Sequence, residues 1–243
     1  MYFGVDYYPE QWEPGMLDED LDRMVELGCN VIRIGEFAWH LMEPQEGKFD
    51  FSFFDRVIAA AGKRGLSVIF GTPTAAPPAW LAHAHPDILS QSETGVPRAY
   101  GGRHVACYLE RCRAIVTALA EHYRGERNIV AWQIDNELGH EGSDKCWCPR
   151  CRRKFQGWLS RKFGGDVSAL NSAYGTAFWS QEYNSFDEIP LPAPTITVHN
   201  PALRLDWERF CSEKIRAFAE EQCDILRRII PNACIIHDFP GGA

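Results

Sequence analysis

The sequence lacks any run of roughly 18 consecutive apolar residues, the length that indicates a membrane-spanning helix. We therefore expect no membrane partner. It also lacks a block of lysine and arginine, and its net charge is -8. Phosphate binding requires a basic face, so this charge argues against a nucleic-acid partner. The N-terminus has no basic region followed by an apolar stretch and a small-residue cleavage site, so we expect a cytoplasmic protein.

Two further observations exclude particular kinds of fold. No G-x-G-x-x-G motif follows the first strand-like run, so the dinucleotide-binding form of an open α/β sheet has no support. The nine cysteines are an odd number, and six of them are scattered through strand-like and helical patterns. That distribution is typical of buried thiols rather than of a disulfide scaffold. Hydrophobic residues make up 45% of the chain, which argues against disorder.

Strand-like and helical patterns alternate along the first part of the chain. Apolar runs predict strands at 2–9, 30–36, 66–73 and 129–139, and amphipathic periodicity predicts helices at 16–27, 53–64 and 111–123. Such alternation favours an α/β fold with a parallel sheet. Right-handed crossovers would curl this sheet into a (β/α)8 TIM barrel or leave it open and doubly wound.

The positions of polar residues favour the barrel. Active sites of (β/α)8 barrels lie at the C-terminal ends of the strands, which line one shared pocket. Polar side chains recur at the expected strand ends, namely Asp6, Arg33, Glu36, Thr72, Thr74, Asn136 and Glu137. The alternative is that these ends are polar only because they meet water.

The stretch 129–139 contains the first catalytic candidate. It begins with apolar and β-branched residues, turns polar at Asp135, Asn136 and Glu137, and ends at Gly139. A buried strand of this shape would deliver a carboxyl group to the mouth of a barrel, so Glu137 is the candidate catalytic residue. The alternative is that the three polar residues only cap the segment that follows.

The chain changes character after this stretch. Residues 140–200 are far more than a simple strand-to-helix connection uses, and they include a predicted helix at 150–163. A long helix is predicted at 203–230 and a fifth strand at 233–239. Five strands cannot close an eight-stranded barrel. Either the 243 residues are part of a longer protein, or the barrel interpretation is wrong.

Three cysteines in the long insertion predict a metal site. Cys146, Cys148 and Cys151 form a Cys-x-Cys-x-x-Cys loop, in which three sulfurs can converge on one point. Thiolates at such spacing are the usual ligands of structural Zn²⁺, and four of them close the tetrahedron. Our choice for the fourth ligand is Cys107. It lies in the segment after the third strand, which is expected on the same side of the sheet as the three-cysteine loop. Cys112 and His140 are the alternatives.

Several motifs together resemble one enzyme family. These are YYPEQW at 7–12, VIRIGEFAW at 31–39, GKFDFSFFD at 47–55, GTPTAAPPAW at 71–80, WQIDNE at 132–137 and YGTAFWS at 174–180, with the three-cysteine loop. The chain resembles the β-galactosidases of glycoside hydrolase family 42 over essentially its whole length. The resemblance implies that residues 1–243 are the N-terminal portion of a (β/α)8 catalytic domain, with a zinc-binding insertion at about 140–200.

The resemblance also implies an activity and roles for particular residues. The family hydrolyses terminal β-galactosides with retention of configuration, and Glu137 is similar to its acid/base. The family's nucleophile, a glutamate after the seventh strand, would lie beyond the end of this chain. Arg33, Asn136 and Trp179 fall on positions that line the galactose subsite. For Arg33 the alternative role is an ion pair with Glu36, and Phe178, next to Trp179, is expected in the core.

The same resemblance implies a cofactor and an assembly. Cys107, Cys146, Cys148 and Cys151 look like the family's zinc ligands, although the segment around Cys107 is shorter than the family pattern. The fifth strand also departs from that pattern, because it has Asp238 where the family has asparagine. Family members often form homotrimers, so a homotrimer is expected.

Two other functions compete with this one. A retaining β-arabinosidase or β-fucosidase of the same barrel type would use the same subsite residues, because those sugars share ring stereochemistry with galactose. If the chain were complete, a non-catalytic, zinc-stabilised carbohydrate-binding protein would be favoured instead. The 243-residue segment alone is expected to be inactive, because it lacks half of the carboxyl pair.

Overall fold

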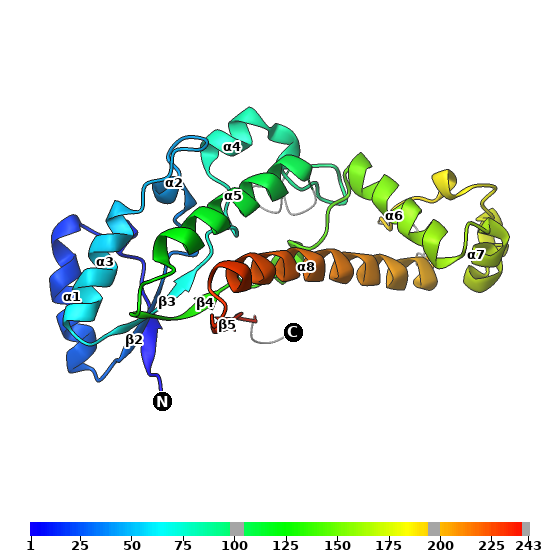
Figure 1. Ribbon diagram of the computed structural model, residues 1–243. Coiled ribbons are helices and arrows are strands. Elements are labelled where there is room, and N and C mark those ends of the chain that lie inside the picture. The colour runs from blue at the N-terminus through cyan, green and yellow to red at the C-terminus, as the bar shows by residue number, and fades with distance from the viewer. Residues whose placement is uncertain (98–104, 194–199, 240–243) are drawn as a thin grey trace. The chain divides into compact units, whose positions relative to one another are not determined.

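The computed structural model describes residues 1–97, 105–193 and 200–239. Its strands form one parallel sheet whose spatial order is the order of the chain (Figure 1). The strands are β1 (Gly4–Asp6), β2 (Val31–Ile34), β3 (Ser67–Gly71), β4 (Ile129–Gln133) and β5 (Ile235–Ile236). The predicted parallel sheet is therefore confirmed. Each strand is shorter than its predicted range because hydrogen-bonded pairing stops where the polar loops begin.

Helices alternate with these strands. They are α1 (Leu17–Glu26), α2 (Trp39–Met42), α3 (Ser52–Lys63), α4 (Ala79–Ala84), α5 (Ala106–Tyr123), α6 (Pro149–Lys162), α7 (Val167–Tyr174) and α8 (Pro201–Ile229). Short 3-10 helices lie at Pro9–Gln11 (η1), Pro14–Met16 (η2), Pro86–Ile88 (η3), His140–Gly142 (η4), Phe178–Ser180 (η5) and Phe186–Glu188 (η6). Within the described ranges, no helix combines the length and the apolar character that crossing a bilayer requires.

Helix α7 was not predicted, although its two ends carry ordinary signals. The Asp166 side chain caps the N-terminus by accepting from the backbone N–H groups of Ser168 at 2.8 Å and Ala169 at 3.3 Å. Gly175 ends the helix with a left-handed φ of 63°. The helix has one fully buried residue, Leu170, so its apolar periodicity is weak. Helix α5 begins at Ala106 rather than at residue 111.

The chain forms two compact units, each described here by itself. The first contains residues 1–88, 105–138 and 218–243, and therefore the whole sheet. Its core consists of strand residues such as Ile32, Val68 and Phe70, all of which are fully buried. The ring of Phe54 in α3 meets that of Phe70 edge to face, with 5.4 Å between their centroids. Helices α1 and α3 pack against each other beside the sheet (Figure 1).

The second unit contains residues 89–104 and 139–217. Its core joins the three-cysteine loop to α6, α7 and the first part of α8. Phe155, Trp207 and Phe210 are buried there, and the rings of Trp207 and Phe210 stack at 5.5 Å. Helix α8 therefore begins in the second unit and ends in the first, with the boundary before Phe218.

No disulfide joins any of the nine cysteines, all of which lie in described residues. The expectation that the six scattered cysteines are buried is correct for Cys29, Cys112 and Cys211 only. Cys107 and Cys223 are half-buried, and Cys234 is exposed. Cys234 directly precedes β5, the short strand at the edge of the described sheet.

Candidate active site

A guanidinium group joins several strands near the C-terminal edge of the sheet. Because all strands are parallel, their C-terminal ends meet at this edge. Arg33 of β2 contacts residues of β1, of β4 and of the segment after β5. Its Nη1 donates to Oε1 of Gln133 at 2.8 Å and to Oδ2 of Asp238 at 3.1 Å, and its Nη2 donates to Oδ2 of Asp6 at 2.8 Å. Its Nε forms an ion pair with Oε1 of Glu36 at 2.9 Å. The predicted alternative role of Arg33 is therefore present in this structure.

The electrostatics of this cluster follow from burial and pairing. Burial alone would lower the pKa of Arg33, but the carboxylates of Glu36, Asp6 and Asp238 raise it above its ordinary value, so the guanidinium stays charged. Burial raises the pKa of Glu36, although Arg33 opposes the rise. The hydroxyl of Tyr8 donates to Oε1 of Glu36 at 3.0 Å. Burial, with the charge of Glu36, raises the pKa of Tyr8 to about 12, so Tyr8 remains a donor at neutral pH.

The candidate acid Glu137 follows β4 at this same edge. Its backbone N–H donates to Oδ1 of Asp238 at 3.1 Å, and the N–H of Leu138 donates to Nε2 of His237 at 3.2 Å. Nδ1 of His237 lies 2.8 Å from the carbonyl oxygen of Ile134, which can only accept. His237 is therefore the neutral tautomer with its proton on Nδ1. Residues after β5 thus hold the segment that follows β4.

Two residues of this segment have unusual backbone angles. Asp135 has a φ of 53° and Glu137 a φ of 40°, in the left-handed region that residues other than glycine rarely adopt. Each such residue costs about 1 kcal/mol or more, so surrounding contacts must hold it in place. Asp135 is fully buried, whereas Asn136 and Glu137 are half-buried. In this segment the Asn136 amide and the Glu137 carboxyl group are therefore partly accessible to solvent, whereas the Asp135 carboxyl group is not.

The carboxyl group of Glu36 has a second carboxyl group, that of Glu10, in its vicinity. Glu36 is fully buried, and its Oε2 has no hydrogen-bond partner in the described part of the chain. Both carboxylate oxygens of Glu10 are also buried without a partner there. Burial raises the pKa of Glu10, and the nearby charge of Glu36 adds to the rise. Glu10 was not predicted as a site residue, although it lies within the first of the quoted motifs.

Trp179 belongs to the second unit, so its place in a galactose subsite stays a prediction. Trp179 is 65% exposed, and Phe178 is 71% exposed. The expectation that Phe178 belongs to the core is wrong. The backbone explains this, because Trp179 and Ser180 have φ values of 60° and 53°, which turn the chain sharply within η5. Both aromatic rings therefore project from the surface of this unit.

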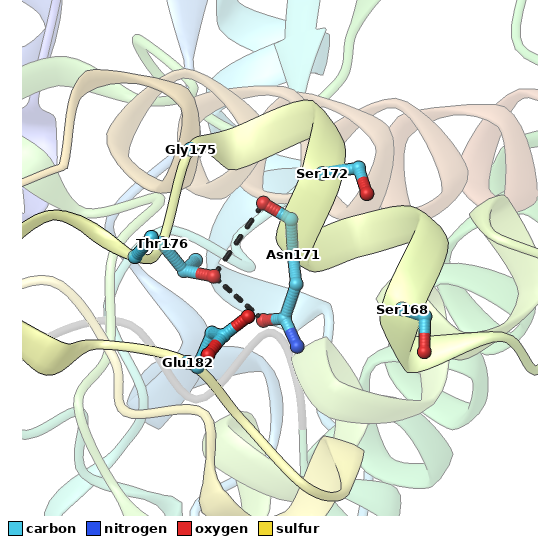
Figure 2. A pocket seen from close by; sticks show the side chains of 7 residues that line it. Ser168, Asn171, Ser172, Gly175, Thr176 and Glu182 are labelled. Carbon is cyan, nitrogen blue, oxygen red and sulfur yellow. Dashed lines mark hydrogen bonds between the residues drawn. The ribbon is translucent and has the colours of Figure 1, made fainter.

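A polar pocket of about 330 Å³ lies beside this turn (Figure 2). The hydroxyl of Thr176 donates to Oδ1 of Asn171 at 2.9 Å, and the backbone N–H of Tyr183 donates to the same oxygen at 3.1 Å. The amide nitrogen of Asn171 donates to the carbonyl oxygen of Tyr183 at 2.8 Å. Asn171 thus fastens the loop that carries Trp179 to α7, which explains the polar lining.

The three cysteines of the insertion converge as predicted for a metal site. One potential ligand atom from each of Cys146, Cys148 and Cys151 lies within 4.8 Å of the others, and all three side chains are buried. The sulfur of Cys148 accepts from the N–H of Cys151, and that of Cys146 accepts from the N–H of Gln91. Three thiol groups in such an arrangement suit Zn²⁺.

The fourth ligand stays a prediction. Cys107 is on α5 of the first unit, where its sulfur lies within 4.8 Å of a ligand atom of His85 and one of Asp87. Cys112 is on the same helix and is buried. His140 belongs to η4 in the second unit, the unit of the three-cysteine loop.

Sequence reasoning missed two residues that hold the candidate site. Asp238 was noticed only as a departure from a family pattern, and its contact with the N–H of Glu137 could not be read from the sequence. Gln222 of α8 accepts a hydrogen bond from Thr72 at 2.6 Å. It is buried on the same helix face as Phe218, Ile225 and Leu226. A polar residue within that apolar stripe was the available signal.

Comparison with known proteins identifies the family. The model for glycoside hydrolase family 42, described as beta-galactosidase, matches residues 6–242. Beta-galactosidase BgaA of Thermus sp. is 44% identical over 243 residues, which cover 98% of this chain and 38% of that relative. The beta-galactosidase of Thermus thermophilus is 45% identical, with the same two coverages. The present chain therefore spans little more than a third of the length of these relatives.

Solved structures agree with this assignment. The beta-galactosidase of the psychrophilic Marinomonas ef1 superposes with a TM-score of 0.91 at 39% identity, covering 98% of this chain and 37% of that one. The catalytic domain of a beta-amylase from Paenibacillus polymyxa, at 13% identity and a TM-score of 0.76, shares the fold alone. The five-stranded parallel sheet is thus the first part of a (β/α)8 barrel. The chain belongs to glycoside hydrolase family 42.

Proposed function

We propose that this chain is the N-terminal part of a retaining β-galactosidase in which Glu137 is the general acid and base. One observation carries the proposal, namely that Asn136 and Glu137 lie in the short segment after β4, which ends at Gln133, at the C-terminal edge of the sheet in a family 42 chain. In (β/α)8 enzymes this edge is where catalytic groups gather. The names of the relatives support galactosides as the substrates.

The chemistry requires two carboxyl groups. In retaining enzymes they stand about 5–5.5 Å apart, so that one bonds covalently to the sugar while the other handles protons. Glu137 would give its proton to the departing oxygen as the glycosidic bond breaks and the nucleophile bonds to the anomeric carbon. It would then take a proton from water, whose oxygen displaces the nucleophile. The nucleophile would be a glutamate beyond residue 243.

The predicted subsite residues have matching abilities. The Asn136 amide can donate to and accept from sugar hydroxyls, and such bonds to the 2-OH strengthen in the transition state. Arg33 carries fixed donors, although its contacts with Asp6, Gln133 and Asp238 occupy two of its nitrogens in this structure. The exposed ring of Trp179 can cover the apolar face of a pyranose.

We expect Cys146, Cys148 and Cys151 to bind structural Zn²⁺ with Cys107 as the fourth ligand. The support is the convergence of three buried sulfurs in the second unit. A closed set of four thiolates would brace the insertion and would take no part in bond cleavage. The homotrimer and the cytoplasmic location stay predictions.

The test of Glu137 is a leaving-group comparison in the full-length enzyme. Glu137→Ala should reduce kcat on lactose at least a thousandfold, because a poor leaving group needs the proton. The loss on an aryl galactoside with an acidic phenol should be far smaller. The matched control is Glu26→Ala, which removes an exposed carboxyl group from the end of α1. Wild-type turnover of lactose by Glu137→Ala would overturn the proposal.

A substrate panel separates the related activities. A β-galactosidase should hydrolyse aryl β-galactosides with a higher kcat/KM than aryl α-L-arabinosides or β-fucosides, which share its ring stereochemistry. The reverse ranking would favour a β-arabinosidase or β-fucosidase and would leave the role of Glu137 intact.

A further inference from the structure

A closed ring of hydrogen bonds lies directly before the candidate acid. The hydroxyl of Thr72 donates to Oε1 of Gln222 at 2.6 Å, and Nε2 of Gln222 donates to the hydroxyl of Thr74 at 3.0 Å. The hydroxyl of Thr74 donates to Oδ2 of Asp135 at 2.6 Å, and the backbone N–H of Asp135 donates to the hydroxyl of Thr72 at 2.7 Å. Each hydroxyl therefore donates once and accepts once, and the ring closes on itself.

The four residues are among the most deeply buried polar groups of the first unit. Thr72, Thr74 and Asp135 have no exposed surface, and Gln222 is 2% exposed. Buried polar groups are costly unless they are bonded, and a fully satisfied network restricts the core to one arrangement. Because the donors and acceptors match in only one way, the ring specifies the position of Asp135 rather than merely tolerating it.

Asp135 also forms hydrogen bonds with residues close to it in the chain, so its fixed position constrains theirs. Its Oδ1 accepts from the backbone N–H of Asn136 at 2.9 Å, and its carbonyl oxygen accepts from Nε2 of Gln133 at 3.1 Å. The left-handed backbone of Asp135 and Glu137 needs such contacts to persist. The carboxylate of Asp135 is thus bonded to the residue directly before Glu137.

We propose that the ring formed by Thr72, Thr74, Asp135 and Gln222 positions Glu137 for proton transfer, with Gln222 and the two threonines as positioning residues. This inference rests on the proposed function of Glu137. None of the four touches the reacting atoms in this account. They fix the backbone that aims the acid, and a displacement of about 1 Å in such a group can cost about a hundredfold in rate.

The experiment removes one hydroxyl from the ring in the full-length enzyme. Thr74→Val keeps the shape of the side chain and deletes the donor to Asp135, whereas Thr74→Ser keeps the hydroxyl. We expect Thr74→Val to lower kcat on lactose about tenfold or more, to lower kcat on an activated aryl galactoside by less than about threefold, and to change KM little. Thr74→Ser should restore most of the lost activity on lactose.

Two further variants keep the test decisive. Gln222→Met has a side chain of similar length without hydrogen-bonding groups, and it should show the same selective loss if Thr74→Val does not fold. Tyr123→Phe is the control, because it removes a different buried hydroxyl of this unit, one that donates to the carbonyl oxygen of Phe51. It should leave the ratio of the two activities unchanged.

The outcomes separate this inference from the proposed function. A selective loss in Glu137→Ala without one in Thr74→Val or Gln222→Met would overturn the positioning role and leave the acid in place. An equal loss of kcat on lactose and on the aryl galactoside in the ring variants would also overturn the positioning role and leave the acid in place. If Glu137→Ala shows no dependence on the leaving group, the proposed function fails and the positioning role fails with it.

Discussion

At the scale of single residues, Glu10 stands out because its carboxyl group is buried without a compensating donor. Neither of its oxygens has a hydrogen-bond partner in the residues that the structure describes. Burial raises its pKa, so the folded protein binds a proton here more readily than the unfolded chain does. The resulting stabilisation is fully present below the unfolded pKa and is lost as the pH rises through the folded pKa.

This sign gives a prediction for Glu10→Gln, which removes the titrating group. The variant should be more stable than the parent at pH 7, by less than about 1 kcal/mol because water still screens the partly accessible side chain. The gain should shrink as the pH falls and Glu10 becomes protonated. Urea unfolding of the full-length protein at pH 7 and pH 4.5 measures both values. A larger gain at the lower pH would contradict the sign.

The sequence predicts the types of the site residues better than their partners. Glu137 and Asn136 could be placed at a strand end because an apolar run precedes them. The link from Thr72 to Gln222 joins residues 150 positions apart, and no local pattern encodes it. The left-handed backbone of Asp135 was equally hidden, because only tertiary contacts hold a residue other than glycine there.

At the scale of elements, Asp206 of α8 joins the helices of the second unit. It is almost fully buried and accepts from Lys162 of α6, from Tyr174 of α7 at 2.6 Å and from Arg209 at 3.0 Å. Burial would raise its pKa, but the hydrogen bonds from Lys162, Tyr174 and Arg209 lower it below the ordinary value. The stabilisation is therefore present above the unfolded pKa of about 3.9 and is lost as the pH falls through the folded pKa.

Asp206→Asn should consequently destabilise the second unit by about 2 kcal/mol at neutral pH, because it leaves Lys162 beside a neutral amide. The difference between variant and parent should narrow below about pH 4. Denaturant unfolding followed by circular dichroism at pH 7 and pH 3.5 tests this. Asp187→Asn, which changes an exposed carboxylate in the same unit, is the control. A deficit that stays constant across the pH range would exclude the ionic contribution.

Helices were predictable where they bury a continuous stripe. The predicted range 53–64 lies within one residue of α3, which buries Phe54, Val57, Ile58 and Ala61. The periodicity fails for α7, which is short and is defined by its caps instead. The sheet was predictable as parallel because strands and helices alternate, but the strand lengths were not, because they depend on pairing with neighbours.

At the scale of the whole molecule, metal binding should decide whether the second unit holds together. The reason is that three buried sulfurs converge there in an arrangement that suits Zn²⁺. We expect about one zinc per chain by elemental analysis of the full-length protein, and a fall in Tm of several degrees after chelation. Cys148→Ser should lose the metal, whereas Cys234→Ser, at an exposed cysteine, should keep it. A metal-free protein with an unchanged Tm would refute the prediction.

The order of the sheet also has a consequence for biosynthesis. Each strand from β2 to β5 pairs with the strand made just before it, and among the described residues no strand inserts between two earlier ones. A chain leaving the ribosome can therefore extend the sheet at its free edge as each new segment appears, because domains generally fold from the N-terminus during translation. The ring around Asp135 can close only when Gln222 emerges, after β1 to β4 have been made and before β5, so the segment that follows β4 would be fixed later than the strands that precede it.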